Sequence, residues 1–323
     1  MNLLKHLLNR FNGLHFNREY CCLSYETFSA FLFFYLVRDN RVGADITHAH
    51  SFAGYSPLIF VLRNQPLLTP GQDIRILISA EPLPENEIIR AKDALAELYL
   101  RPVKIQDTSS GQLLYYKGIS GRHQFLSSFQ QWVGGLYNNW FNRQPGNVFL
   151  NNHLYRQVQV AYALPRIISL ITVEAGGLYN LFPTDLHGQP TGEHYVISLR
   201  TGGKALEQVK KAGRLLLSEM EAGCRSRVYQ LGKNHMQPLK PPDNFFFSGA
   251  FSALFALPLP EGALAYRELE LDSFFEEGIH TLLLFRIRNR QALSAQPQTL
   301  AHIHNAYASW RYKKGLAGNY LGG

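Results

Sequence analysis

The chain has 323 residues, 46% of them hydrophobic, so it is long enough for two ordinary domains with buried cores and disorder is not the default expectation. Its formal net charge of +8 suits an anionic partner, but charge alone does not distinguish a nucleotide, a phosphate, a nucleic acid or a membrane surface. Three cysteines, Cys21, Cys22 and Cys224, form neither a disulfide framework nor a C-x-x-C pair, which fits a reducing cytoplasm best.

No segment of the sequence is expected to enter a membrane. The first 16 residues interrupt their leucines with Lys5, His6 and Arg10, and they lack the small-residue cleavage site of a signal peptide. The most apolar run, residues 28–37, is about half as long as a membrane span. We therefore expect a soluble, cytoplasmic protein.

Residues 1–145 are expected to form a mixed α/β region of unknown role. Residues 28–37 are either a buried helix or a strand, because so short an apolar run is ambiguous by periodicity. Residues 74–79 alternate like a strand, residues 84–100 carry a helical apolar stripe, and residues 103–105 form a short strand. This β-α-β stretch contains no glycine-rich phosphate loop. The aromatic, amide-rich and glycine-rich residues 131–146 are the expected domain boundary.

The sequence changes after residue 146 to short apolar strands separated by turn residues. Strands are expected at residues 158–164, 167–173, 195–199, 245–257 and 281–287, with one helix at residues 204–213. Such spacing indicates a closed β-barrel or a sandwich, so the expected fold class is α+β overall. Glycine and proline follow no constant period, which argues against a repeat protein.

One segment of this second region, residues 195–205, has the composition of an anion site. Ser198 and Thr201 offer hydroxyl donors, and Arg200 offers a planar fork for phosphate oxygens. Lys204 lies near the first turn of a helix, whose free amide groups attract negative charge. The alternative is an ordinary basic surface turn before a helix.

Two further segments carry polar groups next to strands. Residues 168–184 run from a strand through a Gly-Gly turn to Asn180 and the pair Pro183-Thr184, which could line the edge of a flat heterocycle. A turn followed by a helix cap is the alternative there. His280 opens a late apolar strand, and a buried, hydrogen-bonded core histidine is the alternative to a site residue.

The order of these motifs resembles the flavin reductase-like family of FMN-binding split barrels. A strand precedes G-x-x-N-x-x-P-[ST], a second strand ends in S-x-R-x-x-x-K, and G-x-H-T opens a later strand. The resemblance covers residues 149–290 and leaves the first 145 residues unexplained. It implies a C-terminal FMN-binding split β-barrel within residues 146–323, preceded by the mixed α/β N-terminal region.

The resemblance also implies site residues. The flavin ring would be edged by Thr172, Asn180, Leu181, Phe182, Pro183 and Thr184, and the phosphate would be held by Ser198, Leu199, Arg200, Thr201 and Lys204. His280 would shape the ring or nicotinamide side of the pocket. The sequence departs from the family pattern at Thr184, where serine is more frequent, at Ile279, which replaces an aspartate, and in an unusual insert at residues 185–192.

The function implied is that of an FMN-binding oxidoreductase or electron carrier, with FAD as the alternative flavin and NADH or NADPH as electron donor. The resemblance further implies a homodimer with the flavin near the interface. Because the flavin supplies the redox chemistry, we expect no protein acid, base or nucleophile. A divergent split barrel with a binding or structural role and no catalysis is the alternative.

Two other functions find less support. His48 with His50, and His302 with His304, each place two imidazoles two residues apart, but no acidic or cysteine ligand completes either pair, so no metal is expected. The basic, aromatic tail at residues 307–320 lacks a recognised nucleic-acid module, so no nucleic-acid partner is expected.

Overall fold

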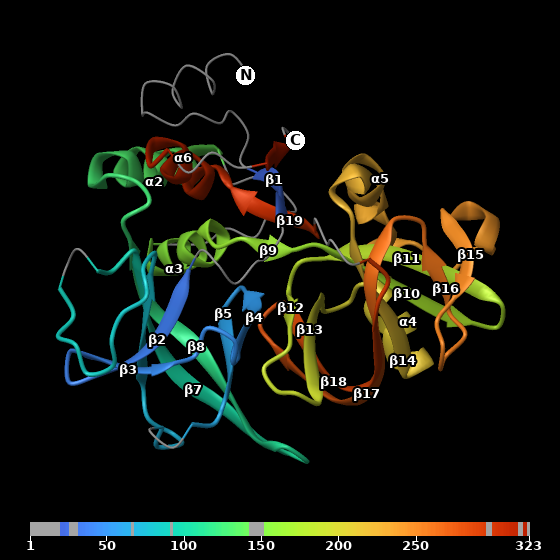
Figure 1. The fold of residues 1–323 in the computed structure, drawn as a ribbon, viewed down its shortest axis with the longest axis horizontal. Helices are drawn as coiled ribbons and strands as arrows, with labels where there is room; N and C mark the ends of the chain where they lie inside the picture. The colour runs from blue at the N-terminus through green and yellow to red at the C-terminus, as the bar shows by residue number, and fades with distance from the viewer. Residues whose placement is uncertain are drawn as a thin grey trace.

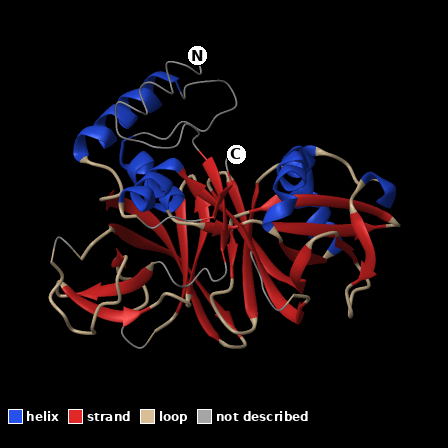
Figure 2. Cartoon of the chain, turned by 45° about the horizontal axis from the view of Figure 1, so that its top comes forward, coloured by secondary structure: helices blue, strands red, loops and turns tan. Residues whose placement is uncertain are grey.

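The structure is a computed structural model that describes residues 20–25, 32–65, 68–90, 93–141, 152–294, 299–315 and 319–321. Strands make up most of the molecule, and Figure 2 shows the larger helices at its periphery. None of the described helices is long and apolar enough to cross a bilayer.

The first sheet is built from the N-terminal part of the chain and is antiparallel throughout. Its order is β3-β2-β6-β7-β8-β5-β4. The strands are β2 (Phe33–Arg38), β3 (Arg41–Asp45), β4 (His50–Tyr55), β5 (Leu58–Arg63), β6 (Ile74–Ser79), β7 (Ala96–Thr108) and β8 (Gly111–His123).

The second sheet follows later in the chain and has the order β11-β10-β14-β17-β18-β13-β12. It curls around α4 (Lys204–Ala212). This helix packs against β10 and β13, which lie toward opposite ends of the strand order, and so fills the interior of the curl. The strands are β10 (Ser169–Ala175), β11 (Leu178–Thr184), β12 (His187–Gly188), β13 (His194–Arg200), β14 (Arg214–Met220), β17 (Ala263–Glu277) and β18 (His280–Ala292).

The remaining strands form two smaller sheets. One of them, the linking sheet, has the order β20-β1-β19-β9 and joins both ends of the described chain to its middle. Its strands are β1 (Tyr20–Tyr25), β9 (Arg166–Ile167), β19 (Thr299–His304) and β20 (Asn319–Leu321). The hairpin of β15 (Phe247–Phe251) and β16 (Pro258–Pro260) lies beside the second sheet.

The remaining helices lie around these sheets. They are α2 (Ser128–Phe141), α3 (Asn152–Ala163), α5 (Arg225–Gln230) and α6 (Asn305–Lys313), with 3-10 turns η2 (Ala222–Cys224), η3 (Leu231–Met236) and η4 (Pro242–Asn244). Helices α3 and α6 contribute Val158, Ala161 and Tyr307 to the core of the first sheet.

The two large sheets have the same topology. When the strands of each sheet are numbered along the chain, both sheets have the order 2-1-5-6-7-4-3, and every neighbouring pair is antiparallel. The sequence has no period of constant length and so predicts no repeat protein. The shared topology is not visible at that level, because strand order is fixed by pairings between distant residues rather than by local pattern.

The two sheets meet across one apolar layer, in which β4 lies against β12 and β13 (Figure 1). The layer is a shared core that contains Ile59 and Tyr115 of the first sheet together with Val196 and Leu284 of the second. At its border the backbone N–H of Ile279 donates to the carbonyl of Ser56 across 3.1 Å. Each sheet thus covers an apolar face of the other.

Several predicted elements are confirmed, two are wrong, and the strand predicted at residues 245–257 is present only as the shorter β15. Residues 74–79 form β6 and the helix predicted at residues 204–213 is α4. The described residues of the range 84–100 form no helix. Residues 96–100 instead pair with β6 and β8 as the start of β7. The strand predicted at residues 158–164 is the end of α3, whose apolar residues pack against β8.

The turn at Gly278 allows the sheets to approach closely. A Cβ atom there would lie 2.2 Å from the carbonyl oxygen of Ser56, and the backbone has φ +63. Gly176 has the same φ of +63 but meets nothing within 4 Å.

We therefore predict that Gly176→Ala costs about 1 to 2 kcal/mol, the penalty of positive φ alone. Gly278→Ala should cost about 1 to 3 kcal/mol more, because the added methyl group pushes the two sheets apart. Urea unfolding of both variants measures the difference, and equal costs would contradict the close approach.

Candidate functional site

A pocket of about 330 Å³ lies between the two sheets. Its volume falls at the lower end of the range of small-molecule sites. One wall comes from the first sheet, and the other comes from the second sheet and the segment that enters it. The lining residues are Leu32, Phe34, Thr47, His48, His50, Ser51 and Phe52 on the first side, and Leu164, Pro165, Arg166, Ile167, Asp185, His187, Gly188, Gln189, Tyr195, Glu219 and Arg267 on the second.

The charged groups of the pocket are paired with each other. The Nε of Arg166 donates to Asp185 across 3.1 Å, and Arg267 donates to Glu219 across 2.5 Å. Burial by itself would raise the pKa of Asp185, but the neighbouring Arg166 and His302 hold it well below its usual value. With two cations matched by two anions, the lining has no formal net charge from these four residues.

Two half-buried histidines of the pocket, His50 and His187, are neutral at neutral pH. Burial lowers the pKa of His187 to about 4 and that of His50 to about 4. The Nε2–H of His187 donates to the carbonyl of Ile167 across 3.1 Å, so its Nδ1 accepts from the hydroxyl of Tyr195 across 2.7 Å. His50 donates to the carbonyl of Ile46 and stacks on Phe60.

Aromatic rings complete the lining. Phe34 and Phe52 are buried on the first-sheet wall and Tyr195 on the second. Aromatic faces and neutral imidazoles together suit an uncharged, flat ring system with polar atoms at its rim.

The residues predicted to edge a flavin ring lie on the hairpin of β10 and β11, outside this pocket. The amide nitrogen of Asn180 donates to Gln208 across 2.7 Å and to the carbonyl of Asn234 across 3.0 Å. The Leu181 carbonyl accepts from Asn234, and the Pro183 carbonyl accepts from His235. Residues of η3 therefore occupy the hydrogen-bonding groups of β11 that the resemblance assigned to contacts with the flavin ring.

The hairpin residues also divide between the two faces of the second sheet. Phe182 packs inside the curl, whereas Leu181 packs in the cluster on the opposite face. Thr172 is fully buried opposite Leu181. Pro183 and Thr184 line a smaller cavity of about 190 Å³, which shares Asp185 with the pocket between the sheets.

The residues predicted to hold a phosphate surround the end of β13. Leu199 is buried inside the curl, whereas the side chains of Arg200 and Lys204 are exposed. The hydroxyls of Thr201 and Thr281 are 3.0 Å apart. This group and the hairpin group are linked by the core inside the curl, which contains both Leu199 and Phe182, and by the bond of Asn180 to Gln208 of α4. The two groups do not share a described cavity.

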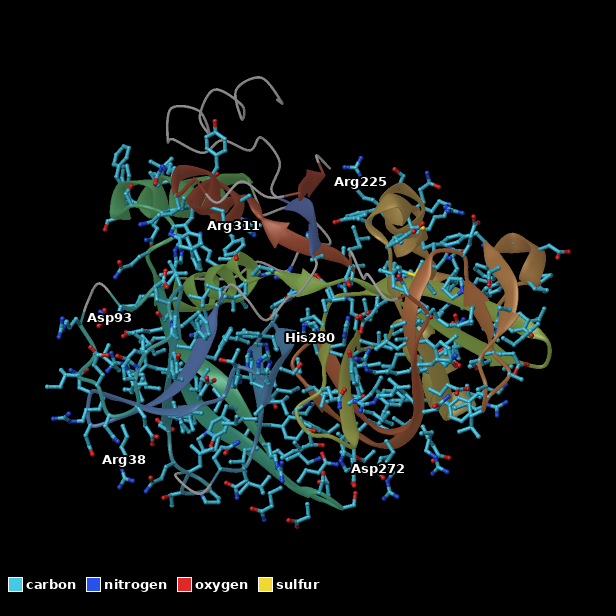
Figure 3. The ribbon with its side chains drawn as sticks, in the orientation of Figure 1. Arg38, Asp93, Arg225, Asp272, His280 and Arg311 are labelled. Carbon is cyan, nitrogen blue, oxygen red and sulfur yellow. The ribbon has the colours of Figure 1, made fainter. Side chains whose placement is uncertain are left out.

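His280 lies where the two halves of the molecule meet (Figure 3). Its Nε2 accepts from the backbone N–H of Tyr55 across 3.2 Å, so its Nδ1–H donates to the hydroxyl of Ser198 across 3.1 Å. Burial lowers the pKa of His280 to about 4, and Arg200 acts in the same direction. His280 thus connects the second sheet to β4 of the first in a neutral form.

Sequence reasoning missed most of the pocket. The wall at residues 185–189 was noted only as part of an unusual insert, although it directly follows Pro183-Thr184 in the chain. The first-sheet wall has no local signal, because its residues join the pocket only through packing between the sheets. His48 was considered as a metal ligand, yet it is an exposed residue of the pocket, and His302 binds Asp185 across 3.0 Å.

No protein-family model matches the chain, and no curated protein matches it. Solved structures align with about half of it. An FMN-binding protein from Thermus thermophilus is 21% identical over 41% of this chain and 74% of its own, with a TM-score of 0.35. The NADH:FAD oxidoreductase of Streptomyces globisporus is 14% identical over 50% and 96%, with a TM-score of 0.41. The styrene monooxygenase flavin reductase of Pseudomonas putida is 21% identical over 51% and 95%, with a TM-score of 0.39.

The neutral, buried histidines predict a loss of stability in acid. His50, His123, His187 and His280 each have a pKa of about 4 in the folded chain. An unfolded histidine titrates near 6.5, so the unfolded chain takes up protons first as the pH falls. The contribution of these four histidines to the free energy of unfolding is complete above about pH 6.5 and is lost progressively toward pH 4.

We expect the Tm to fall by at least about 5 °C between pH 7 and pH 5. His280→Asn, which retains an acceptor for Tyr55, should show a shallower fall over the same interval. Differential scanning calorimetry at fixed ionic strength measures both, and a Tm that does not decrease toward pH 5 would contradict the neutral state of these residues.

Proposed function

We propose that the protein is an FMN-binding oxidoreductase of the flavin reductase type, and that it holds the flavin ring in the pocket between its two sheets. The observation that supports this most is the position of the pocket wall. Residues 185–189 directly follow the predicted flavin-edge motif that ends at Pro183-Thr184, and they face aromatic residues of the first sheet.

The lining fits a flavin ring in size and chemistry. A cavity of about 330 Å³ accommodates a flat ring system, while the ribityl phosphate would extend toward solvent. Arg166 is paired with Asp185 and Arg267 with Glu219, so these charges largely cancel within the lining. Such a lining favours an uncharged ring over a charged one. Pro183 and Thr184, in the adjoining cavity, remain proposed contacts of the ring edge.

The bound flavin would supply hydride and electron transfer, with NADH or NADPH as the proposed donor. The chain's own residues hold and shield it. Phe34, Phe52 and Tyr195 exclude water from the ring faces, and the fixed hydrogen bonds of His187 keep the second wall in one arrangement. No described side chain is required to exchange a proton in such a transfer.

The phosphate is proposed to bind at Ser198, Arg200, Thr201 and Lys204, as the resemblance implies. Two features support this: the guanidinium of Arg200 and the ammonium of Lys204 are solvent-exposed, and Lys204 begins α4, where free amide groups favour an anion. The amide of Asn180 would have to give up its bonds to Gln208 and Asn234 to contact a ligand.

The alternative, a binding protein without catalysis, is favoured by one observation. The side-chain nitrogen atoms of His280 and Asn180, two of the predicted site residues, all make hydrogen bonds within the chain. Flavin uptake without oxidation of NADH or NADPH would distinguish this alternative from the proposed enzyme.

Titration of the purified chain with FMN tests the proposal, with quenching of flavin fluorescence as the readout. Gln189→Trp should weaken binding at least about tenfold, a loss of about 1.4 kcal/mol, because a large side chain at the pocket wall occupies the ring site. The matched control Gln72→Trp places the same side chain at an exposed loop residue outside the pocket and should bind like the unaltered chain. Equal affinity in all three proteins would place the flavin elsewhere, and no uptake by the unaltered chain would refute the function.

A further inference from the structure

We infer that the first half of the chain is a duplicate of the second, and that it supplies one wall of the pocket within the same chain. The part of this inference that concerns flavin rests on the proposed function. Its consequence is that one chain contains one complete flavin site and needs no partner chain to form it.

The first argument is the shared topology together with a shared register. Both large sheets have the strand order 2-1-5-6-7-4-3. When the first residues of β8 and β18 are aligned, Leu113 corresponds to Leu282 and Tyr115 to Leu284, and all four belong to the core between the sheets. The intervening residues Leu114 and Leu283 both point into the core of their own sheet.

Neighbouring strands keep the same correspondence. Tyr115 pairs with Val61 on β5, and Leu284 pairs with Val196 on β13. Both valines are again in the core between the sheets. Equivalent residues therefore occupy equivalent places in a contact that involves two different segments of one chain, which is the arrangement expected of a fused pair of copies.

The second argument is that contacts between the halves are reciprocal, as in an interface with two-fold symmetry. The turn between β17 and β18 contacts the turn between β4 and β5, where Ile279 donates to Ser56. The turn between β7 and β8 contacts the loop between β12 and β13, where Ser109 donates to Glu193 across 2.9 Å. The same loop receives a second contact, between the hydroxyls of Ser110 and Thr191 across 3.3 Å.

The two halves differ where a ligand would be held. The position equivalent to His280 is Gly111, and the position equivalent to Ser198, read from the pairing with β8, is Arg63. Between β5 and β6 the described residues 64–65 and 68–73 form no helix, whereas α4 stands between β13 and β14. The proposed phosphate site therefore exists in the second half alone, and we expect one flavin for each chain.

His48 is the first-half residue best suited to test this assignment. It lines the pocket, its side chain is exposed, and no core packing depends on it. A tryptophan there would cover the ring site from the first-half wall without opening a cavity in the core.

The experiment combines FMN titration with light scattering of the same samples. We expect one FMN bound per chain, in a particle with the mass of one chain. His48→Trp should weaken binding at least tenfold while the control Gln72→Trp does not.

Binding of two flavins per chain, binding only by a dimer, or unchanged affinity of His48→Trp would overturn the inference and leave the proposed function standing. No FMN uptake by the unaltered chain would instead refute the proposed function. It would also refute the role of the first half as a wall of the flavin pocket. Circular dichroism of both tryptophan variants establishes that they are folded, and His48→Tyr, with a smaller ring at the same exposed position, provides a second reading if His48→Trp fails to fold.

Discussion

The apolar layer between the two sheets is the interaction on which the rest of the structure depends. An antiparallel sheet can leave one face in water only if that face is polar, and here both facing surfaces carry buried aliphatic and aromatic residues. Each sheet therefore needs the other as its cover. The pocket exists because this layer stops short of the ends of β4 and β12, where charged pairs and histidines replace the apolar side chains.

Glycine makes this contact close. A Cβ at Gly188 would lie 2.4 Å from the hydroxyl of Ser51, so the backbones of β12 and β4 approach each other beside the pocket as they do at Gly278. Because Gly188 carries no side chain, β12 packs directly on Ser51 of β4, and the distance between the two walls beside the pocket is held by this contact. The pocket is to that extent preorganised.

Local patterns predicted the elements whose sequence and environment agree. The alternation at residues 74–79 and the stripe of α4 are examples, since each element buries one face in a neighbouring core. Residues 84–100 and 158–164 were assigned the wrong type, because pairing with distant strands and packing on β8 outweighed local preference. The resemblance identified the hairpin and the basic turn, but the site roles of those residues stay predictions. The first-half wall could not be predicted, because it joins the pocket only through packing between distant segments.

The return of the chain end to the first half has a consequence for how the molecule assembles. Ala301, Tyr307 and Ala308 are buried among residues of the first sheet, so that core is complete only when a segment about two hundred residues further along the chain arrives. During synthesis the apolar surface of the first sheet stays open until residues 301–308 have been made. The order of synthesis and the order of completion are thus reversed: the half made first is finished last.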